Sequence, residues 1–442
     1  MSQRIQPRTL KGFRDHLPEA AAPRDRVIEI AKGVYRRFGY APIDTPALEY
    51  TEILLGKGGD ETDKQLYRFE DNGGRDVALR FDLTVPLARF VAQHVGELGT
   101  PFKRYHVGPV WRGENTQRGR YREFIQCDFD TIGTESIVAD IETVLVIHEL
   151  FGALGFDRFT VRVNNRKVLN GLLERLELHE SSTAVLRALD KLPKVGPDAV
   201  RAELASAAGA TDAQADDILA LADLHGENHD ILERLGPLVA GAPTGEDGLA
   251  QLARIVDGVS AAAPAAGRLE IDVSIARGLD YYTGTVFETF LDDLPGIGSC
   301  CSCGRYDDLA SLYTSQRLPG VGASLGVDRL LAAMDELGLL ADHTAGPQVL
   351  VTLFDDARVS DHLAVAAELR RAGLDVELYP DARKLGNQLK YADRRSHRLA
   401  IIIGDSEWEA GTAQVKDLAS GDSREVARSE LADTCRTILS GP

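Results

Sequence analysis

Hydrophobic residues at helical spacing mark the helices of this sequence. Between Pro23 and Phe38 apolar residues recur three and four positions apart, and Gly39 follows where a helix would end. The same spacing predicts a long helix from Glu135 to Leu154. From about residue 165 to 260 the chain is rich in Ala and Leu, with helical patterning and no good strand. We expect a helical insertion there.

Alternating and continuous apolar runs predict strands. Two pairs of such runs flank polar, Gly-containing segments and predict β-hairpins: Leu66–Phe69 with Val77–Phe81, and Phe102–Trp111 with Tyr121–Thr131. Further strand-like runs span Leu269–Ile275 and Thr285–Phe290. These patterns predict a sheet that is at least partly antiparallel.

A change of pattern near Ala345 predicts a second domain. Apolar strands at Val349–Phe354, Val376–Tyr379 and Leu399–Ile403 alternate with helical segments. Alternation of this kind is typical of a small α/β domain with a largely parallel sheet. We therefore expect one domain over residues 1–345 and another over 346–442.

Composition and charge restrict the class of protein. The chain has 442 residues, 44% of them hydrophobic, which is long for one domain. No apolar run is long enough to cross a bilayer and the N-terminus is polar, so we expect a cytoplasmic protein with no membrane partner. A net charge of −18 confines any RNA contact to local basic segments. Two segments qualify, with a solvated face as the alternative for each: Lys103, Arg104, Arg112, Arg118, Arg120 and Arg122; and Arg383, Lys384, Lys390, Arg394, Arg395 and Arg398.

The five cysteines do not indicate a disulfide framework or a metal site. Cys300, Cys301 and Cys303 crowd together, whereas Cys127 and Cys435 lie far away in sequence. A zinc site would require a fourth ligand and usually a CxxC spacing. We expect small buried or loop thiols and no protein-ligated metal.

The segment from Tyr121 to Thr131 separates into two faces when it is read as a strand. Ile125, Cys127 and Phe129 suit a core, whereas the other face carries Arg122, Phe124, Gln126, Asp128 and Asp130. An aromatic ring, an amide, carboxylates and a guanidinium in line can stack a base, hold an ammonium group and bind phosphate. Similar alternation places Arg80, Asp82 and Thr84 on one face of the earlier strand that begins at Val77. It places Asp272 and Ser274 on one face of the strand at 269–275. The strands together predict a polar cleft, although each alone is equally well explained as a half-exposed strand.

Two glycine-rich stretches add candidate residues. Ala-Arg-Gly-Leu-Asp-Tyr-Tyr-Thr-Gly at 276–284 presents Arg277, Tyr281 and Tyr282 from a loop; a structural turn is the alternative. Residues 320–331, Gly-Val-Gly-Ala-Ser-Leu-Gly-Val-Asp-Arg-Leu-Leu, do not form a GxxxxGK[ST] phosphate loop. Arg329 nevertheless lies at the start of a predicted helix, where phosphate binding is favourable.

These residues, in this order, resemble the class II aminoacyl-tRNA synthetases. The helix and strand ending at Thr45-Pro46 are similar to the first motif of that class, VWRGEN and RGRYREF to the second, and GVGASLGVDRL to the third. RGLDYYTG and CGRYDDL resemble signatures of the histidine-specific enzymes, and KGFRD extends the likeness to the N-terminus. The similarity covers essentially the whole chain.

The resemblance implies an α+β fold with an antiparallel catalytic sheet, a helical insertion and a C-terminal α/β anticodon-binding domain. It implies a homodimer built on the first motif, and L-histidine, ATP with Mg²⁺ and tRNA(His) as substrates. Asp82, Thr84 and Gln126 would hold the α-amino group of histidine, and Asp130, Tyr281 and Tyr282 would surround its imidazole. Arg112 and Arg277 would bind the α-phosphate and the histidine carboxylate, Phe124 and Arg329 would stack on adenine, and Glu114 and Arg120 would hold the rest of ATP.

One alternative belongs to another functional class. A catalytically inactive, synthetase-like regulatory subunit would bind histidine or uncharged tRNA as a sensor. Such a protein would be expected to lose motif residues or the C-terminal domain, whereas this sequence retains Arg112, Arg277 and Arg329. A synthetase for another amino acid is the other alternative, and RGLDYYTG argues against it.

Overall fold

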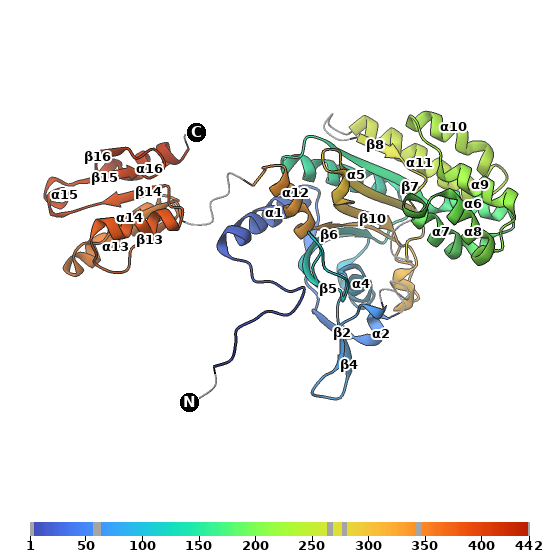
Figure 1. Cartoon of the computed structure of the whole chain (residues 1–442), viewed down its shortest axis with the longest axis horizontal. Helices are drawn as coiled ribbons and strands as arrows, with labels where there is room; N and C mark the ends of the chain where they lie inside the picture. The colour runs from blue at the N-terminus through green and yellow to red at the C-terminus, as the bar shows by residue number, and fades with distance from the viewer. Residues whose placement is uncertain (1–3, 56–62, 263–267, 276–280, 341–346, 441–442) are drawn as a thin grey trace. The chain divides into compact units, whose positions relative to one another are not determined.

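The computed structural model describes residues 4–55, 63–262, 268–275, 281–340 and 347–440 (Figure 1). The chain divides into two compact units, one of Met1–Arg14 with Arg24–Leu339, and the other of Asp15–Pro23 with Leu340–Pro442. Within the described residues, no helix has both the length and the apolar character that a membrane span requires.

An eight-stranded sheet forms the centre of the first unit. Its order is β1-β5-β6-β11-β10-β9-β7-β8, and every pairing is antiparallel except those of the two edge strands, β1 and β8. The strands are β1 (Ala41–Pro42), β5 (Phe102–Trp111), β6 (Glu123–Ile132), β7 (Phe159–Asn165), β8 (Arg268–Ile271), β9 (Thr285–Leu291), β10 (Cys301–Arg305) and β11 (Gly320–Gly326). The predicted hairpin of Phe102–Trp111 is confirmed as β5 and β6, and the run at 269–275 forms a strand only as far as Ile271.

Apolar residues of β6 attach this sheet to the first helix, α1 (Pro18–Arg37). Cys127 and Phe129 are fully buried, as the face analysis predicted. The Tyr35 ring lies 5.0 Å from the Phe129 ring, and the Tyr35 hydroxyl donates to the carbonyl of Cys127 over 3.1 Å. The opposite face of β6 is therefore left for the polar side chains.

A small sheet lies between β1 and β5 in sequence and has the order β2-β4-β3 (Leu48–Tyr50, Asp76–Leu79 and Arg68–Glu70). The predicted turn is confirmed, with Gly74 at a φ of 75° that glycine adopts readily. β4 ends at Leu79, so Asp82 and Thr84 do not lie on a strand as expected. Asp82 instead accepts the Val85 N–H over 3.0 Å at the start of α4 (Thr84–Leu98), and α2 (Thr51–Leu54) packs nearby.

Helices fill the chain between β7 and β8. They are α6 (Arg166–Arg175), η1 (His179–Ser181), α7 (Ser182–Val195), α8 (Pro197–Ala208), α9 (Asp212–Ala222), α10 (Asn228–Val239) and α11 (Pro243–Ala262). Two glycines allow α6 and α11 to cross closely, because a Cβ on Gly171 would lie 2.3 Å from the Cα of Gly245. The predicted helix at 135–154 is confirmed as α5 (Ile137–Ala153), which packs against α11 and β11. η2 (Pro295–Ile297), η3 (Leu309–Leu312) and α12 (Val327–Glu336) complete the described helices of this unit.

The second unit contains a five-stranded sheet of order β13-β12-β14-β15-β16. β12 (Val349–Val351) is parallel to β13 (Val376–Leu378) and β14 (Leu399–Ile402), as predicted, whereas β15 (Thr412–Asp417) and β16 (Ser423–Ala427) add an antiparallel hairpin that the sequence analysis missed. The sheet is therefore mixed. Its helices are η4 (Asp356–Arg358), α13 (Val359–Arg371), α14 (Leu385–Arg394), α15 (Asp405–Ala410), η5 (Arg428–Glu430) and α16 (Leu431–Leu439).

Candidate active site

A cleft of about 290 Å³ opens over the polar face of β6, β10 and β11. Eleven of the twelve site residues predicted from the sequence line this one cleft: Asp82, Thr84, Arg112, Glu114, Arg120, Phe124, Gln126, Asp130, Tyr281, Tyr282 and Arg329. The twelfth, Arg277, lies outside the described residues. Segments that are distant in sequence thus converge on a single cavity.

The glycines of β10 and β11 make room for side chains of the cleft. Gly322 is the register partner of Asp130, and a Cβ at this position would lie 2.0 Å from the Asp130 carboxylate oxygen Oδ1. On the next strand, a Cβ on Gly304 would lie 2.5 Å from the ring of Tyr282. Glycines of the third motif and of the CGRYDDL stretch therefore leave room for Asp130 and Tyr282, respectively.

Two residues that the sequence analysis did not include in the site fix the position of Asp130. The fully buried Arg104 forms an ion pair with it, the guanidinium Nη2 lying 2.6 Å from Oδ2, and the Tyr306 hydroxyl donates to Oδ1. Burial raises the pKa of Asp130, and the charge of Arg104 opposes that rise. Strand register could have identified Arg104, because it lies directly opposite Asp130 on β5.

Polar contacts also orient Asp82 and Gln126. The Tyr281 hydroxyl donates to Asp82 Oδ2 over 3.2 Å, while burial raises the pKa of Asp82. Gln126 donates from Nε2 to the Ser324 hydroxyl over 2.7 Å, and its buried Oε1 has no hydrogen-bond partner among the described residues. Acceptor oxygens therefore gather at this end of the cleft, where they suit a bound cation.

Asp128 differs from its neighbours on the same face of β6. It is 1% exposed and is not among the residues that line the cleft, contrary to the expectation that it would face the cavity. Burial raises the pKa of Asp128 to about 8, although Arg104 lowers it. The side chain of Asp128 is therefore buried outside the cleft lining and is not placed to contact a ligand.

Arginines and an aromatic ring also line the cleft. Arg112 donates from Nε to the carbonyl of Phe81 over 2.9 Å, and its Cζ lies 5.2 Å from the centre of the Phe124 ring. Arg329 donates to the carbonyl of Ser299, and both burial and the charge of Arg120 lower its pKa. The guanidinium groups of Arg120 and Arg329 repel one another, and this arrangement favours an anion between them.

Several polar residues of the predicted strand faces do not line the cleft. Arg122 instead donates to the backbone carbonyl of Glu114 over 3.2 Å. Arg80 is buried and donates to the carbonyls of Thr45 and Pro109. Asp272 pairs with Arg162 over 3.1 Å, after β8 has ended. Each of these side chains binds a backbone carbonyl or an oppositely charged side chain of the protein. The alternation of residues along a strand does not reveal such partners.

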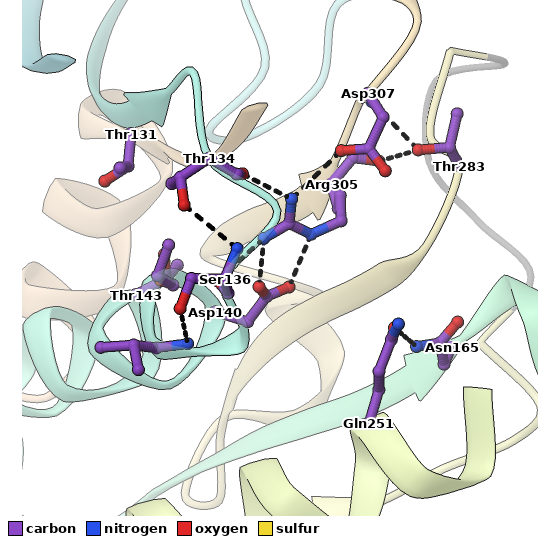
Figure 2. Close-up of polar contacts among 12 residues, drawn as sticks. Thr131, Thr134, Ser136, Asp140, Thr143, Asn165, Gln251, Thr283, Arg305 and Asp307 are labelled. Atoms are coloured by element: carbon purple, nitrogen blue, oxygen red, sulfur yellow. Dashed lines mark hydrogen bonds and ion pairs between the residues drawn. The ribbon is translucent and has the colours of Figure 1, made fainter. Parts of the chain in front are cut away.

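Arg305 is the centre of a polar network next to the cleft residues (Figure 2). It comes from the CGRYDDL stretch and pairs with Asp140 at the start of α5, while also donating to the carbonyl of Thr134 over 3.1 Å. Its own carbonyl accepts the N–H of Thr283, whose hydroxyl in turn accepts the N–H of Asp307 over 3.0 Å (Figure 2). This network anchors the chain immediately after Tyr281 and Tyr282.

The cysteine cluster is divided between the cleft and the core. Cys300 lines the cleft, which the sequence analysis did not predict, and burial raises its pKa to about 12. Cys301 and Cys303 are buried on the other face of β10, with their sulfur atoms 3.8 Å apart. Among the residues that the structure describes, no group of three or more His, Cys, Asp or Glu side chains could hold a metal ion.

A mostly antiparallel sheet beneath a cleft lined by acids, arginines and an aromatic ring is the arrangement expected of a class II aminoacyl-tRNA synthetase. The comparisons agree: the family model for histidyl-tRNA synthetase matches residues 12–330, and an anticodon-binding domain matches residues 348–438. The chain is 59% identical over 425 residues to a histidine–tRNA ligase of Rhodopirellula baltica, with 96% of each chain covered. It is 45% identical over 430 residues to a histidine–tRNA ligase of Wolinella succinogenes, with 97% of each covered.

A solved structure is similar over the same length. The crystal structure of histidyl-tRNA synthetase from Nostoc sp. PCC 7120 is 34% identical, has a TM-score of 0.88 and covers 98% of this chain and 100% of its own. The chain belongs to the histidyl-tRNA synthetase family.

Proposed function

We propose that this chain activates L-histidine with ATP, forming histidyl-adenylate and pyrophosphate, and then transfers histidine to the 3′ end of tRNA(His). The cleft carries this proposal, because it joins an acidic end and an arginine-lined end in one cavity. Family membership supplies the identity of the substrates.

The acidic end suits histidine. Asp82, Thr84 and Gln126 would hold the α-ammonium group, which requires acceptor oxygens, and two of these residues present buried oxygens. Asp130 would accept an imidazole N–H, with Tyr281 and Tyr282 around the ring. A site built to bond such groups strongly rejects amino acids that lack them.

The arginine-lined end suits ATP. Phe124 would stack on adenine with Arg329 on its other side, Arg112 and Arg277 would bind the α-phosphate and the histidine carboxylate, and Glu114 and Arg120 would hold the remainder. Mg²⁺ would enter with the nucleotide and neutralise phosphate charge; such an ion needs only one or two protein carboxylates, and Glu114 is available on this wall. The role of Arg277 is inferred from the sequence.

The proposed chemistry requires positioning and charge more than a protein nucleophile. Attack of the histidine carboxylate on the α-phosphate brings two anions together, and the arginines stabilise the charge that develops. The attacking carboxylate is already ionised, so the first step needs no general base. Alignment of the two substrates lowers much of the remaining barrier.

Three further features belong to the proposal. The chain would act in the cytoplasm as a homodimer that associates through α1 and β1, because both residues of the edge strand β1 are exposed beside a hollow lined by Ile28, Pro42 and Asp44. The domain from residue 346 onward would read the anticodon, and residues 1–345 would form the catalytic domain with its helical insertion.

ATP–pyrophosphate exchange with each natural amino acid in turn tests the function. Exchange should depend on histidine and on no other amino acid. Exchange with a different amino acid would indicate another synthetase, and histidine binding without exchange would indicate a regulatory subunit. Either outcome would contradict the proposal.

A further inference from the structure

The N-terminal strap, defined here as Lys11–Arg14, contacts the loop that joins β5 to β6. The guanidinium carbon of Arg14 lies 3.7 Å from the centre of the Tyr121 ring, which is a cation–π geometry. The same guanidinium forms an ion pair with Asp328, whose side chain is 6% exposed. Arg14 therefore connects two walls of the cleft, since both Tyr121 and Asp328 line it.

The strap backbone binds the same loop. The carbonyl of Gly12 accepts the Arg122 N–H over 2.9 Å. Gly12 has a φ of 86°, and a Cβ at this position would lie 2.7 Å from the Arg122 side chain and 2.9 Å from that of Thr116. Only glycine suits both the backbone angle and this close approach. The contact is therefore built into the local structure and is not a loose surface association.

Asp328 transmits the contact to the strand that forms the cleft floor. One of its carboxylate oxygens binds Arg14, and the other accepts the backbone N–H of Ile125 over 3.2 Å. Ile125 lies on β6 between Phe124 and Gln126, which line the two ends of the cleft. Asp328 also directly precedes Arg329 in α12. The strap thus meets the loop, the strand and the helix at the nucleotide end.

We propose that Arg14 is a positioning residue for ATP: the strap holds the 112–122 loop against α12, so that Glu114, Arg120 and Arg329 are pre-arranged for the nucleotide. This inference rests on the proposed function only in the identity of the nucleotide. Pre-arranged groups cost less to order on binding, which is why such a contact increases affinity without touching the ligand.

The test compares ATP affinity and histidine affinity in Arg14→Ala. We expect the KM for ATP in histidine-dependent exchange, and the dissociation constant of ATP alone, to rise on the order of tenfold, as expected for losing a cation–π contact and a partly buried ion pair together. The KM for histidine should change much less, because the polar partners that the structure gives Asp82 and Asp130 lie outside the strap. Arg14→Lys should recover part of the ATP affinity, since it restores the charge.

Controls separate positioning from folding. Arg8→Ala removes an exposed arginine that precedes the strap and should match the wild type. Amide hydrogen exchange across residues 113–122 should accelerate in Arg14→Ala and slow again with saturating ATP. Asp328→Asn should weaken ATP binding similarly, and the double variant should be less than additive because both changes remove one interaction.

Unchanged ATP affinity in a folded Arg14→Ala protein would overturn the inference, as would an equal loss of affinity for ATP and histidine. If Arg14→Ala fails to fold, Arg14→Lys and Asp328→Asn decide the question by the same split. Failure of the proposed function would appear differently, as a wild-type protein that binds ATP but shows no histidine-dependent exchange.

Discussion

Replacing Gly322 with Ala should damage histidine binding selectively. The new Cβ would lie 2.0 Å from Oδ1 and 2.3 Å from Cγ of Asp130, whereas ordinary van der Waals contact begins near 3.4 Å. The carboxylate must therefore retreat by more than an ångström. The new Cβ would also lie 2.7 Å from the backbone carbonyl oxygen of Phe129. Gly322 does not have a positive φ, so alanine is excluded by these contacts and not by its own backbone angle.

The size of the effect follows from what the retreat breaks. In the wild-type structure Asp130 Oδ2 lies 2.6 Å from Nη2 of Arg104, and Oδ1 accepts the Tyr306 hydroxyl. The substitution would disturb both contacts. Disturbing a buried charged group that receives a ligand hydrogen bond costs about 2–4 kcal/mol. That corresponds to a fall in kcat/KM for histidine of roughly 30- to 1000-fold, while the KM for ATP should stay nearly constant.

Steady-state exchange at varied histidine and varied ATP, with a thermal melt, provides the measurement. Gly152→Ala is the matched control, because a Cβ there meets nothing within 4 Å on helix α5. A folded Gly322→Ala protein with a wild-type KM for histidine would refute the reasoning, since it would show that the position of Asp130 does not matter. If the variant does not fold, Tyr306→Phe provides a second test, because it removes one partner of Asp130 and adds no atoms to the core.

Three further predictions concern other parts of the molecule. Burial raises the pKa of Asp130 and the Tyr306 hydroxyl lowers it, so Tyr306→Phe should raise it further. The carboxylate is protonated as pH falls through that pKa, so on lowering the pH the KM for histidine should begin to rise at a higher pH in the variant than in the wild type. Deleting residues 346–442 should leave adenylate formation largely intact and weaken aminoacylation; normal aminoacylation by a folded truncated protein would contradict the domain assignment. Reversing the charge of Lys390 and Arg394, both exposed on α14, should weaken tRNA binding and reduce its salt slope by about one per lost phosphate contact. An unchanged slope would indicate a solvated face.

Local periodicity was sufficient to predict most elements and the cleft face of β6. Alternation identified Phe124, Gln126 and Asp130 correctly, because a strand buried on one side constrains its side chains to two faces. The same reasoning failed for Asp128, which lies on the correct face but beneath the floor. Alternation predicts on which face of the sheet a side chain lies. It does not predict whether neighbouring residues bury that side chain.

Residues that act across long sequence distances were the ones missed. Arg104 reaches Asp130 through the pairing of β5 with β6, and Arg14 reaches Asp328 across 314 positions. Neither interaction has a local signal, because the partner is determined by strand register or by the path of an irregular segment. The hairpin of β15 and β16 was missed for a different reason, which is its weak hydrophobic pattern. β15 carries only two buried apolar residues, Ala413 and Val415, so its alternation is weak.

The arrangement of charge in the cleft orients the amino acid under the proposed function. The buried guanidinium of Arg104 pairs with Asp130 and its charge acts on Asp128, while Asp82 is a third buried carboxyl group of this region. Arg112 lies near Asp82, whose pKa it lowers, and Arg329 is positioned near Arg120 in the same cleft. An amino acid is itself a dipole, so its ammonium group is stabilised at the acidic end and its carboxylate toward the arginines, where the α-phosphate would be. Under the proposed function, the field of the site would align the attacking carboxylate with ATP before any contact to the side chain selects histidine.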